Sequence, residues 1–257
     1  MALMLLAHAH GLVVTAIHVD HGLRTESASD IDVIDPVAES LGISVIVHSV
    51  QVEHGPNLEA RARAARYGVM PDDVMTGHTA DDQAETVLIN LLRGAGAQGL
   101  GAMRPGMSRP LLALRRSDTH AVCASAGIAT ITDSTNTDPK FQRNRVRNEL
   151  LPLMTEISLR DPVPLLVRSA DVLRDDNDLL EELARNLDPT DAVALAAAPT
   201  PLARRALRQW LSDPYPPDLA TLERIMAVAR GETLACDIGE NREIRRSKQR
   251  LILQLLG

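Results

Sequence analysis

Strand-like and helix-like stretches alternate over about the first 135 residues, and this alternation restricts the fold more than any other feature of the chain. Residues 12–19 and 43–50 are rich in β-branched and apolar side chains, and residues 74–76 and 128–131 form shorter runs of the same kind. Such runs are typical of parallel strands that helices cover on both faces. Helix-like stretches lie between them at residues 1–10, 27–41, 58–67, 80–93 and 117–127. The alternation therefore predicts an α/β domain built on a parallel sheet.

Residues 76–86 read Thr-Gly-His-Thr-Ala-Asp-Asp-Gln-Ala-Glu-Thr and contain the beginning of a helix. Thr79 is placed to cap this helix, and Asp82 stands three residues later in the capping-box position. Gly94 follows where a helix would stop. These signals predict a helix over residues 80–93.

Three carboxylates lie near one edge at the start of this helix, since Asp81 and Glu85 are four residues apart and Asp82 and Glu85 are three apart. The same helix end carries a positive pole and unpaired N–H groups, which suit a nucleotide phosphate and its magnesium. The alternative is that the acids only complement the helix dipole. Gly77 and His78, just past a strand end, favour a binding site.

The second part of the chain has a different character. From Arg143 onward the pattern is mainly helical, so we expect domains at residues 1–155 and 156–257. Residues 161–191 hold nine acids against three bases and predict a solvated helix face. Residues 234–256 alternate around a Gly-Glu pair and predict a small basic hairpin, for which we favour contact with RNA.

Composition excludes several classes of protein. The net charge of −7 argues against indiscriminate nucleic-acid binding, and four aromatic residues are too few for extended base stacking. No apolar run is long enough to cross a bilayer, and no signal peptide is expected at the start of the chain. Cys123 and Cys236 form neither a metal-type pair nor a disulfide framework, which fits a reducing cytoplasm.

Six blocks, taken in order, closely resemble bacterial tRNA(Ile)-lysidine synthases. The blocks are residues 19–24, 57–67, 77–86, 109–112, 133–136 and 143–147. They cover about the first 155 residues, and the remainder resembles the small substrate-binding domain of that family more weakly. The resemblance implies an adenine-nucleotide-hydrolase-like, Rossmann-like sheet with helices on both faces, lacking its first strand, followed by a small and mostly helical domain.

The resemblance also implies a reaction. ATP adenylates the C2 oxygen of the wobble cytidine in the CAU anticodon of tRNA(Ile), releasing pyrophosphate. The ε-amine of free L-lysine then attacks C2 and displaces AMP, which gives lysidine. The implied cofactors are ATP and Mg²⁺, and the implied partners are the tRNA and lysine.

The resemblance assigns the nucleotide to the carboxyl ends of the strands, where open α/β sheets bind ligands. Candidate ATP-binding residues are Val19, His21, Gly77, His78 and Asp81, with Asp81 also the candidate ligand of magnesium. Asp82 and Glu85 are candidates for the lysine amine, because a buried ammonium needs paired carboxylates. The roles of the three acids are not separated.

Candidate catalytic residues are Asp82, Asp133 and Arg143, although residues 133–136 equally suit a structural turn. Basic residues near the expected site suit contact with tRNA phosphates. The tRNA-binding candidates are Arg24, Arg61, Arg63, Arg109, Arg143, Asn144 and Arg147. For Arg61 and Arg63, a solvated helix face is the alternative.

One part of the family pattern is absent from this sequence. The PP-loop ATP pyrophosphatases, to which the family belongs, begin with a strand and a Ser-Gly-Gly-x-Asp-Ser loop that wraps the pyrophosphate of ATP. That strand would be central, between the runs that end at Val19 and Thr76, so its absence would leave a gap of about 10 Å, two strand spacings. We therefore expect a start codon assigned too late or a gene fragment, and a poorly folded, inactive chain as written.

Two alternatives remain. A PP-loop tRNA thiolase would need reactive or cluster-binding cysteines, and neither Cys123 nor Cys236 has that context. A non-catalytic tRNA-binding remnant would bind tRNA with a salt-dependent affinity and consume no ATP.

Overall fold

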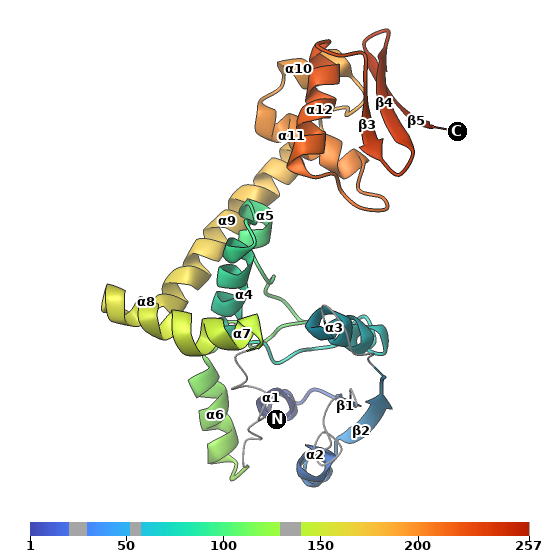
Figure 1. Ribbon diagram of the computed structural model, residues 1–257. Coiled ribbons are helices and arrows are strands. Elements are labelled where there is room, and N and C mark those ends of the chain that lie inside the picture. The colour runs from blue at the N-terminus through green and yellow to red at the C-terminus, as the bar shows by residue number, and fades with distance from the viewer. Residues whose placement is uncertain (21–29, 52–57, 129–139, 257) are drawn as a thin grey trace. The chain divides into compact units, whose positions relative to one another are not determined.

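The computed structural model describes residues 1–20, 30–51, 58–128 and 140–256. These residues form two compact units, Met1–Ala170 and Asp171–Gly257 (Figure 1). We call them the first and the second unit. The domain boundary expected after residue 155 stays a prediction.

The first unit is an α/β structure, as the alternating pattern predicts. In chain order its elements are α1 (Ala2–Ala9), β1 (Thr15–Asp20), α2 (Asp30–Ser40), β2 (Ser44–Ser49), α3 (Leu58–Gly68), α4 (Ala80–Leu92), α5 (Ala97–Leu100), α6 (Arg116–Ser125), α7 (Gln142–Arg145), the π-helical turn η3 (Val146–Leu150) and α8 (Leu151–Ser158). Helix α9 (Pro162–Arg185) begins in the first unit and ends in the second. The helices expected around the first two strands are therefore confirmed as α1, α2 and α3.

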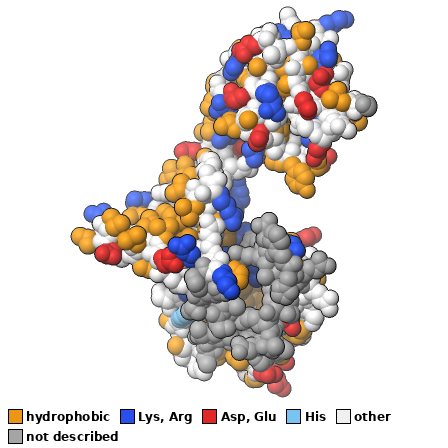
Figure 2. Space-filling view, viewed as in Figure 1, with side chains coloured by type: hydrophobic (Ala, Val, Ile, Leu, Met, Phe, Trp, Pro, Cys, Tyr) orange, Lys and Arg blue, Asp and Glu red, His pale blue; other side chains and the backbone are white. Residues whose placement is uncertain are grey.

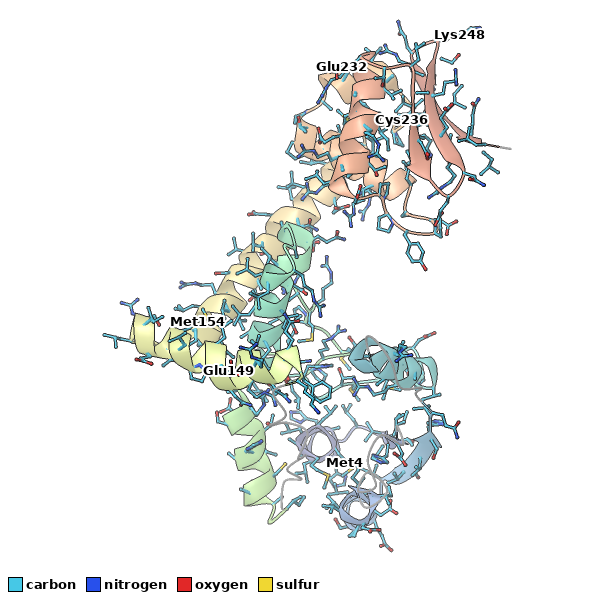
Figure 3. All side chains as sticks on the ribbon, viewed as in Figure 1. Met4, Glu149, Met154, Glu232, Cys236 and Lys248 are labelled. Atoms are coloured by element: carbon cyan, nitrogen blue, oxygen red, sulfur yellow. The ribbon has the colours of Figure 1, made fainter. Side chains whose placement is uncertain are left out.

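Strands β1 and β2 pair in parallel, with Thr15 opposite Ser44 and Asp20 opposite Ser49. Buried apolar side chains of the flanking helices pack with this pair, among them Ala38 of α2 and Met4 of α1, which Figure 3 labels. Removing such side chains from water is the main favourable contribution to folding. The Rossmann-like parallel arrangement of the sequence prediction is confirmed for these strands.

The strand expected at residues 74–76 is wrong for the structure as described. Among the described residues, its one backbone bond to another segment runs from the Thr76 amide to the Ser108 carbonyl at 2.9 Å, which is too little for a ladder. A cavity of about 630 Å³, lined mainly by apolar side chains, separates β1 from residues 70–75. In the part of the chain that the structure describes, no strand pairs with this segment. The strand expected at residues 128–131 falls almost entirely outside the described residues.

Helix α4 begins and ends as its sequence predicts. The amide and the hydroxyl of Thr79 both donate to Asp82 Oδ2, each at 2.8 Å. The helix ends at Leu92, and Gly94 adopts a φ of +74°, a conformation that costs glycine little. The capping box and the glycine stop therefore set the bounds of the helix that carries the three acids.

Apolar packing fixes the start of α4 against the helices that follow residue 140. The buried members of this cluster are Ala80, Ala84, Leu88, Val146, Leu151 and Val163. Figure 1 shows α4 beside α7, and the two helices are in contact. This packing brings the acids of α4 close to the arginines of α7 and η3.

The second unit holds helices and a sheet. After the end of α9 its elements are α10 (Ala192–Ala197), α11 (Thr200–Trp210), α12 (Leu219–Arg230), β3 (Ala235–Gly239), β4 (Arg242–Ser247) and β5 (Arg250–Leu255). The strands pair antiparallel in the order β3-β4-β5, so the expected hairpin is part of a three-stranded sheet. The turn between β4 and β5 contains Lys248 and Gln249, which both have positive φ.

Exposed apolar side chains gather on α8, as Figure 2 shows. Ile157 on this helix and Leu159 just after it are 74% and 88% exposed. Across the described ranges, no helix combines the length and the apolar character that crossing a membrane requires.

Candidate functional site

The start of α4 carries a compact cluster of charged side chains. Its acids come from the first turns of α4, and its bases come from the start of α6 and from α7 and η3. The members are Asp81, Asp82, Glu85, Arg115, Arg116, Arg143 and Arg147. We call this set the charge cluster.

Glu85 is its most buried member, with no exposed surface. Its carboxylate accepts hydrogen bonds from Arg143 Nε and Arg147 Nε, each at 2.7 Å, and from Arg116 Nη2 at 3.0 Å. Arg147 Nη2 adds a fourth bond at 3.1 Å. A buried carboxylate needs such compensation, because burial of an unpaired charge is very costly.

Asp82 lies in the first turn of the same helix, and its side chain is 17% exposed. One of its oxygens is held by the capping bonds of Thr79, and the other accepts from Arg116 Nη2 and Arg143 Nη2, both at 3.2 Å. Arg116 and Arg143 therefore each contact both Asp82 and Glu85. This sharing fixes the orientation of the two guanidinium groups.

Asp81 faces a different arginine. Its carboxylate accepts from Arg115 Nε and Nη2, both at 3.1 Å, and from the Arg116 amide at 2.7 Å. Arg115 also pairs with Asp161. The described residues contain no group of three histidine, cysteine or acidic side chains that could hold a metal ion. Here the Asp81 carboxylate is paired with Arg115, and its role as a magnesium ligand stays a prediction.

Hydrogen bonds set the charge state of the acids. Burial alone would raise the pKa of Glu85, but the bonds and charges of Arg147 and Arg143 outweigh burial, so its pKa lies below the ordinary 4.5. The pKa of Asp82 is also lowered, since the Thr79 bonds and the charges of Arg116 and Arg143 outweigh burial. Both acids are therefore ionised at neutral pH.

The lowered pKa of Glu85 predicts an acid-sensitive fold. The unfolded chain binds a proton there more readily, so the stabilisation is complete above about pH 4.5 and is lost as the pH falls through the folded-state value. We expect the urea midpoint, followed by circular dichroism from neutral to acidic pH, to fall less steeply for Glu85→Gln than for the unmodified chain. If the urea midpoints of the two chains fell equally steeply with pH, Glu85 would not be the source of the acid sensitivity.

The structure brings together five of the residues that the sequence selected: Asp81, Asp82, Glu85, Arg143 and Arg147. Sequence reasoning missed Arg115 and Arg116. Their only signal is a pair of adjacent arginines directly before a helix, which by itself is common on solvated surfaces. They belong to the cluster because they contact acids of α4 that lie 31 to 35 residues earlier in the chain.

Other candidates have different surroundings. The His78 ring lies 2.8 Å from Thr76 Oγ1, and Gly77 is exposed. Val19 lies in β1 opposite His48, and Arg109 reaches the Arg104 carbonyl at 3.4 Å.

Three further candidates lie on α3 and α7. Arg61 lies on α3, and Asn144 is buried on α7. Arg63 also belongs to α3, but its side chain is not among those that the structure describes. The candidates His21, Arg24 and Asp133 lie outside the described residues.

Comparison with known protein families shows the class of protein to which the chain belongs. Residues 1–154 match the model of the PP-loop domain, and residues 191–252 match the model of the TilS substrate binding domain. The first match covers more than half of the chain, so this is a PP-loop protein.

The relatives define the family. A tRNA(Ile)-lysidine synthase of Mycolicibacterium paratuberculosis is 42% identical over 212 residues, which are 77% of this chain and 66% of that protein. A tRNA(Ile)-lysidine synthase of Nocardia farcinica is 37% identical over 253 residues, which are 90% of this chain and 80% of that protein. The chain belongs to the tRNA(Ile)-lysidine synthase family, as its six sequence blocks predict.

A solved structure supports the fold. The U34-tRNA thiolase NcsA from Methanococcus maripaludis, with its [4Fe-4S] cluster, superposes with a TM-score of 0.51 and covers 67% of this chain and 69% of its own. Its sequence identity is 14%, so the likeness concerns the fold alone.

Proposed function

We propose that this chain acts in the synthesis of lysidine on tRNA(Ile), with ATP adenylating C2 of the wobble cytidine and the ε-amine of lysine displacing AMP. The observation that carries the proposal is the presence, in one chain, of a PP-loop domain followed by the substrate-binding domain of this enzyme family. Use of ATP follows from the family, and Mg²⁺, L-lysine and the CAU anticodon are parts of the proposal.

Within this reaction we assign Arg143 to the phosphate charge that develops during adenylation. Its Nε and Nη2 are held by Glu85 and Asp82, so the guanidinium is oriented before substrate arrives. Preorganised donors of this kind stabilise developing negative charge without reorganisation. Arg147 shares the Glu85 carboxylate and extends the same basic surface.

Asp82 and Glu85 stay predictions for the lysine amine. Both are ionised, as an ammonium partner must be, but their oxygens already accept from arginines. Lysine would have to displace these contacts or bind beside them. The role of Asp133 as a catalytic residue is likewise a prediction.

An assay with the purified 257-residue chain, a tRNA with a CAU anticodon, ATP and labelled lysine tests the function. Incorporation of lysine that requires ATP would establish the reaction and refute the sequence prediction of inactivity. Retention of the tRNA on a filter without incorporation or AMP release would favour the non-catalytic remnant. Absence of both would contradict both functions.

The cysteines disfavour the thiolase alternative. Cys123 is buried in the first unit, and Cys236 belongs to the second. Burial raises the pKa of the Cys236 thiol, which reduces the fraction of reactive thiolate at neutral pH.

A further inference from the structure

The carboxylate of Glu85 accepts as many hydrogen bonds as a carboxylate can. An ionised carboxyl group has about four positions at which its two oxygens accept a hydrogen bond. Oε1 of Glu85 accepts from Arg116 Nη2 and Arg147 Nε, and Oε2 accepts from Arg143 Nε and Arg147 Nη2. These bonds fill the acceptor positions of Glu85, so a ligand that donates to Glu85 has to replace an arginine.

Asp82 is saturated in the same way. Its Oδ2 accepts from the amide and the hydroxyl of Thr79, and its Oδ1 accepts from Arg116 Nη2 and Arg143 Nη2. The Thr79 bonds belong to the capping box of α4, so replacing them would also remove the cap of the helix. A ligand therefore replaces a donor at Oδ1 at a lower cost than at Oδ2.

Among the three arginines that hold these acids, Arg116 makes the contacts that are easiest to replace. One nitrogen, Nη2, makes both of them, at 3.2 Å from Asp82 Oδ1 and 3.0 Å from Glu85 Oε1. The Nε atoms of Arg143 and Arg147 lie closer to Glu85, at 2.7 Å each. The Arg116 side chain is also the most exposed, at 29% against 24% for each of the other two. A ligand that enters from solvent therefore displaces Arg116 first.

Arg116 Nη2 donates in the manner of an ammonium nitrogen. A lysine ammonium is a compact charge whose one nitrogen donates up to three hydrogen bonds. Arg116 likewise reaches two carboxylates of the same helix from one nitrogen. A lysine Nζ at this place would donate to the same two oxygens and keep a third proton for another acceptor.

We propose that Arg116 is an internal competitor of the substrate lysine: its Nη2 holds the place between Asp82 and Glu85 that the ε-ammonium takes on binding. The proposal rests on the proposed function, which supplies lysine as the substrate. Arg116 is then a specificity-determining residue, because only a cationic ligand replaces a guanidinium there without leaving buried acids unpaired. It also lowers the affinity for lysine, since its contacts have to break before the ammonium binds.

Calorimetric titration of the whole chain with L-lysine, without ATP or tRNA, tests this role. We expect Arg116→Met to bind lysine about tenfold more tightly than the unmodified chain, because the two acids regain acceptor positions; tenfold is near the lower end of the effect of one charge-assisted hydrogen bond. The matched variant Arg115→Met should change the affinity less than twofold. Arg115 pairs with Asp81 and Asp161, and Asp81 still accepts from the Arg116 amide in that variant.

Titration with Nε-acetyl-lysine shows whether the gain arises at the ammonium. This ligand keeps the α-amino and α-carboxyl groups of lysine but has no charge at the end of the side chain. We expect Arg116→Met and the unmodified chain to bind it equally. A gain as large as that for lysine would mean that Arg116 only blocks space, which would overturn the competitor role.

Thermal unfolding of each variant shows whether it is folded. If Arg116→Met does not fold, Arg116→Gln takes its place and is compared with Arg115→Gln. Glutamine keeps one amide donor, so the expected gain in lysine affinity is smaller but has the same direction. Damage to the cluster would weaken lysine binding, so a gain distinguishes competition from a purely structural role.

Unchanged or weaker lysine binding by a folded variant of Arg116 would contradict the proposal, and so would the absence of lysine binding by all of the chains. The titrations need no turnover and are therefore separate from the lysine-transfer assay. Transfer by the unmodified chain, together with unchanged lysine binding by Arg116→Met, would keep the proposed function and reject the competitor role. Tighter binding without transfer would keep the competitor role and count against the function.

Discussion

Replacing Glu85 with alanine is expected to destabilise the first unit by about 3 kcal/mol, the lower end of the range for removing one partner of a buried ion pair. The carboxylate has no exposed surface and accepts from three arginines, which would lose their common partner. The lower end applies because these arginines are partly exposed, so water can compensate some of the lost contacts.

The measurement is urea unfolding, combined with hydrogen exchange of the α4 amides as a local probe of the first unit. Glu149→Ala is the control, because Glu149 pairs with Arg145 four residues away on an exposed surface (Figure 3). Exposed pairs of this kind contribute little to stability. If both variants lowered the protection of α4 equally, the buried cluster would have no special role in the fold.

Local signals predicted helix α4 well. Thr79, Asp82 and Gly94 lie within a short segment, and their effects on a helix depend on backbone geometry that neighbours in sequence determine. The parallel pairing of β1 and β2 was predictable for a similar reason, since two apolar runs separated by a helix form a parallel pair.

The composition of the charge cluster was less predictable. Three acids at a helix start indicate a cation as their partner when only the helix is considered. The cations are instead side chains of the same protein, and they lie up to 62 residues further along the chain. The resemblance selected Arg143 and Arg147, but no local pattern connects Arg116 with Glu85.

The strand expected at residues 74–76 failed for another physical reason. A short apolar run has the composition of a strand, but a strand also requires a neighbour for its backbone N–H and C=O groups. In the described structure a cavity separates this run from β1, and no described strand pairs with it. The composition of the run predicts a tendency to form a strand, but a strand forms only where its backbone pairs with a neighbouring strand.

The three-stranded sheet of the second unit was also predicted only in part from its sequence. Alternation around Gly239 predicted β3 and β4, which form one hairpin. The two residues Lys248 and Gln249 turn the chain again into β5, although neither is a typical residue for positive φ. Burial of Leu251 in the core offsets this unfavourable turn.

Leu207→Ala is expected to destabilise the second unit by about 2–5 kcal/mol, the range for removing a buried leucine side chain. Leu207 lies on α11 with no exposed surface, in a core that also contains Ile225 of α12 and Ile244 of β4. The cost includes the lost burial and the cavity that remains between the helices and the sheet. Its size depends on how far this core can close around the missing side chain.

Trp210 provides the measurement, because it is the one tryptophan of the chain and packs against the same core. Its fluorescence during urea unfolding should show an earlier midpoint for Leu207→Ala. Leu219→Ala, at a side chain that is 60% exposed on α12, should leave the midpoint nearly unchanged. Equal shifts would mean that Leu207 does not contribute to this core as described. A shift confined to Leu207→Ala would establish that the helices and the sheet share one core.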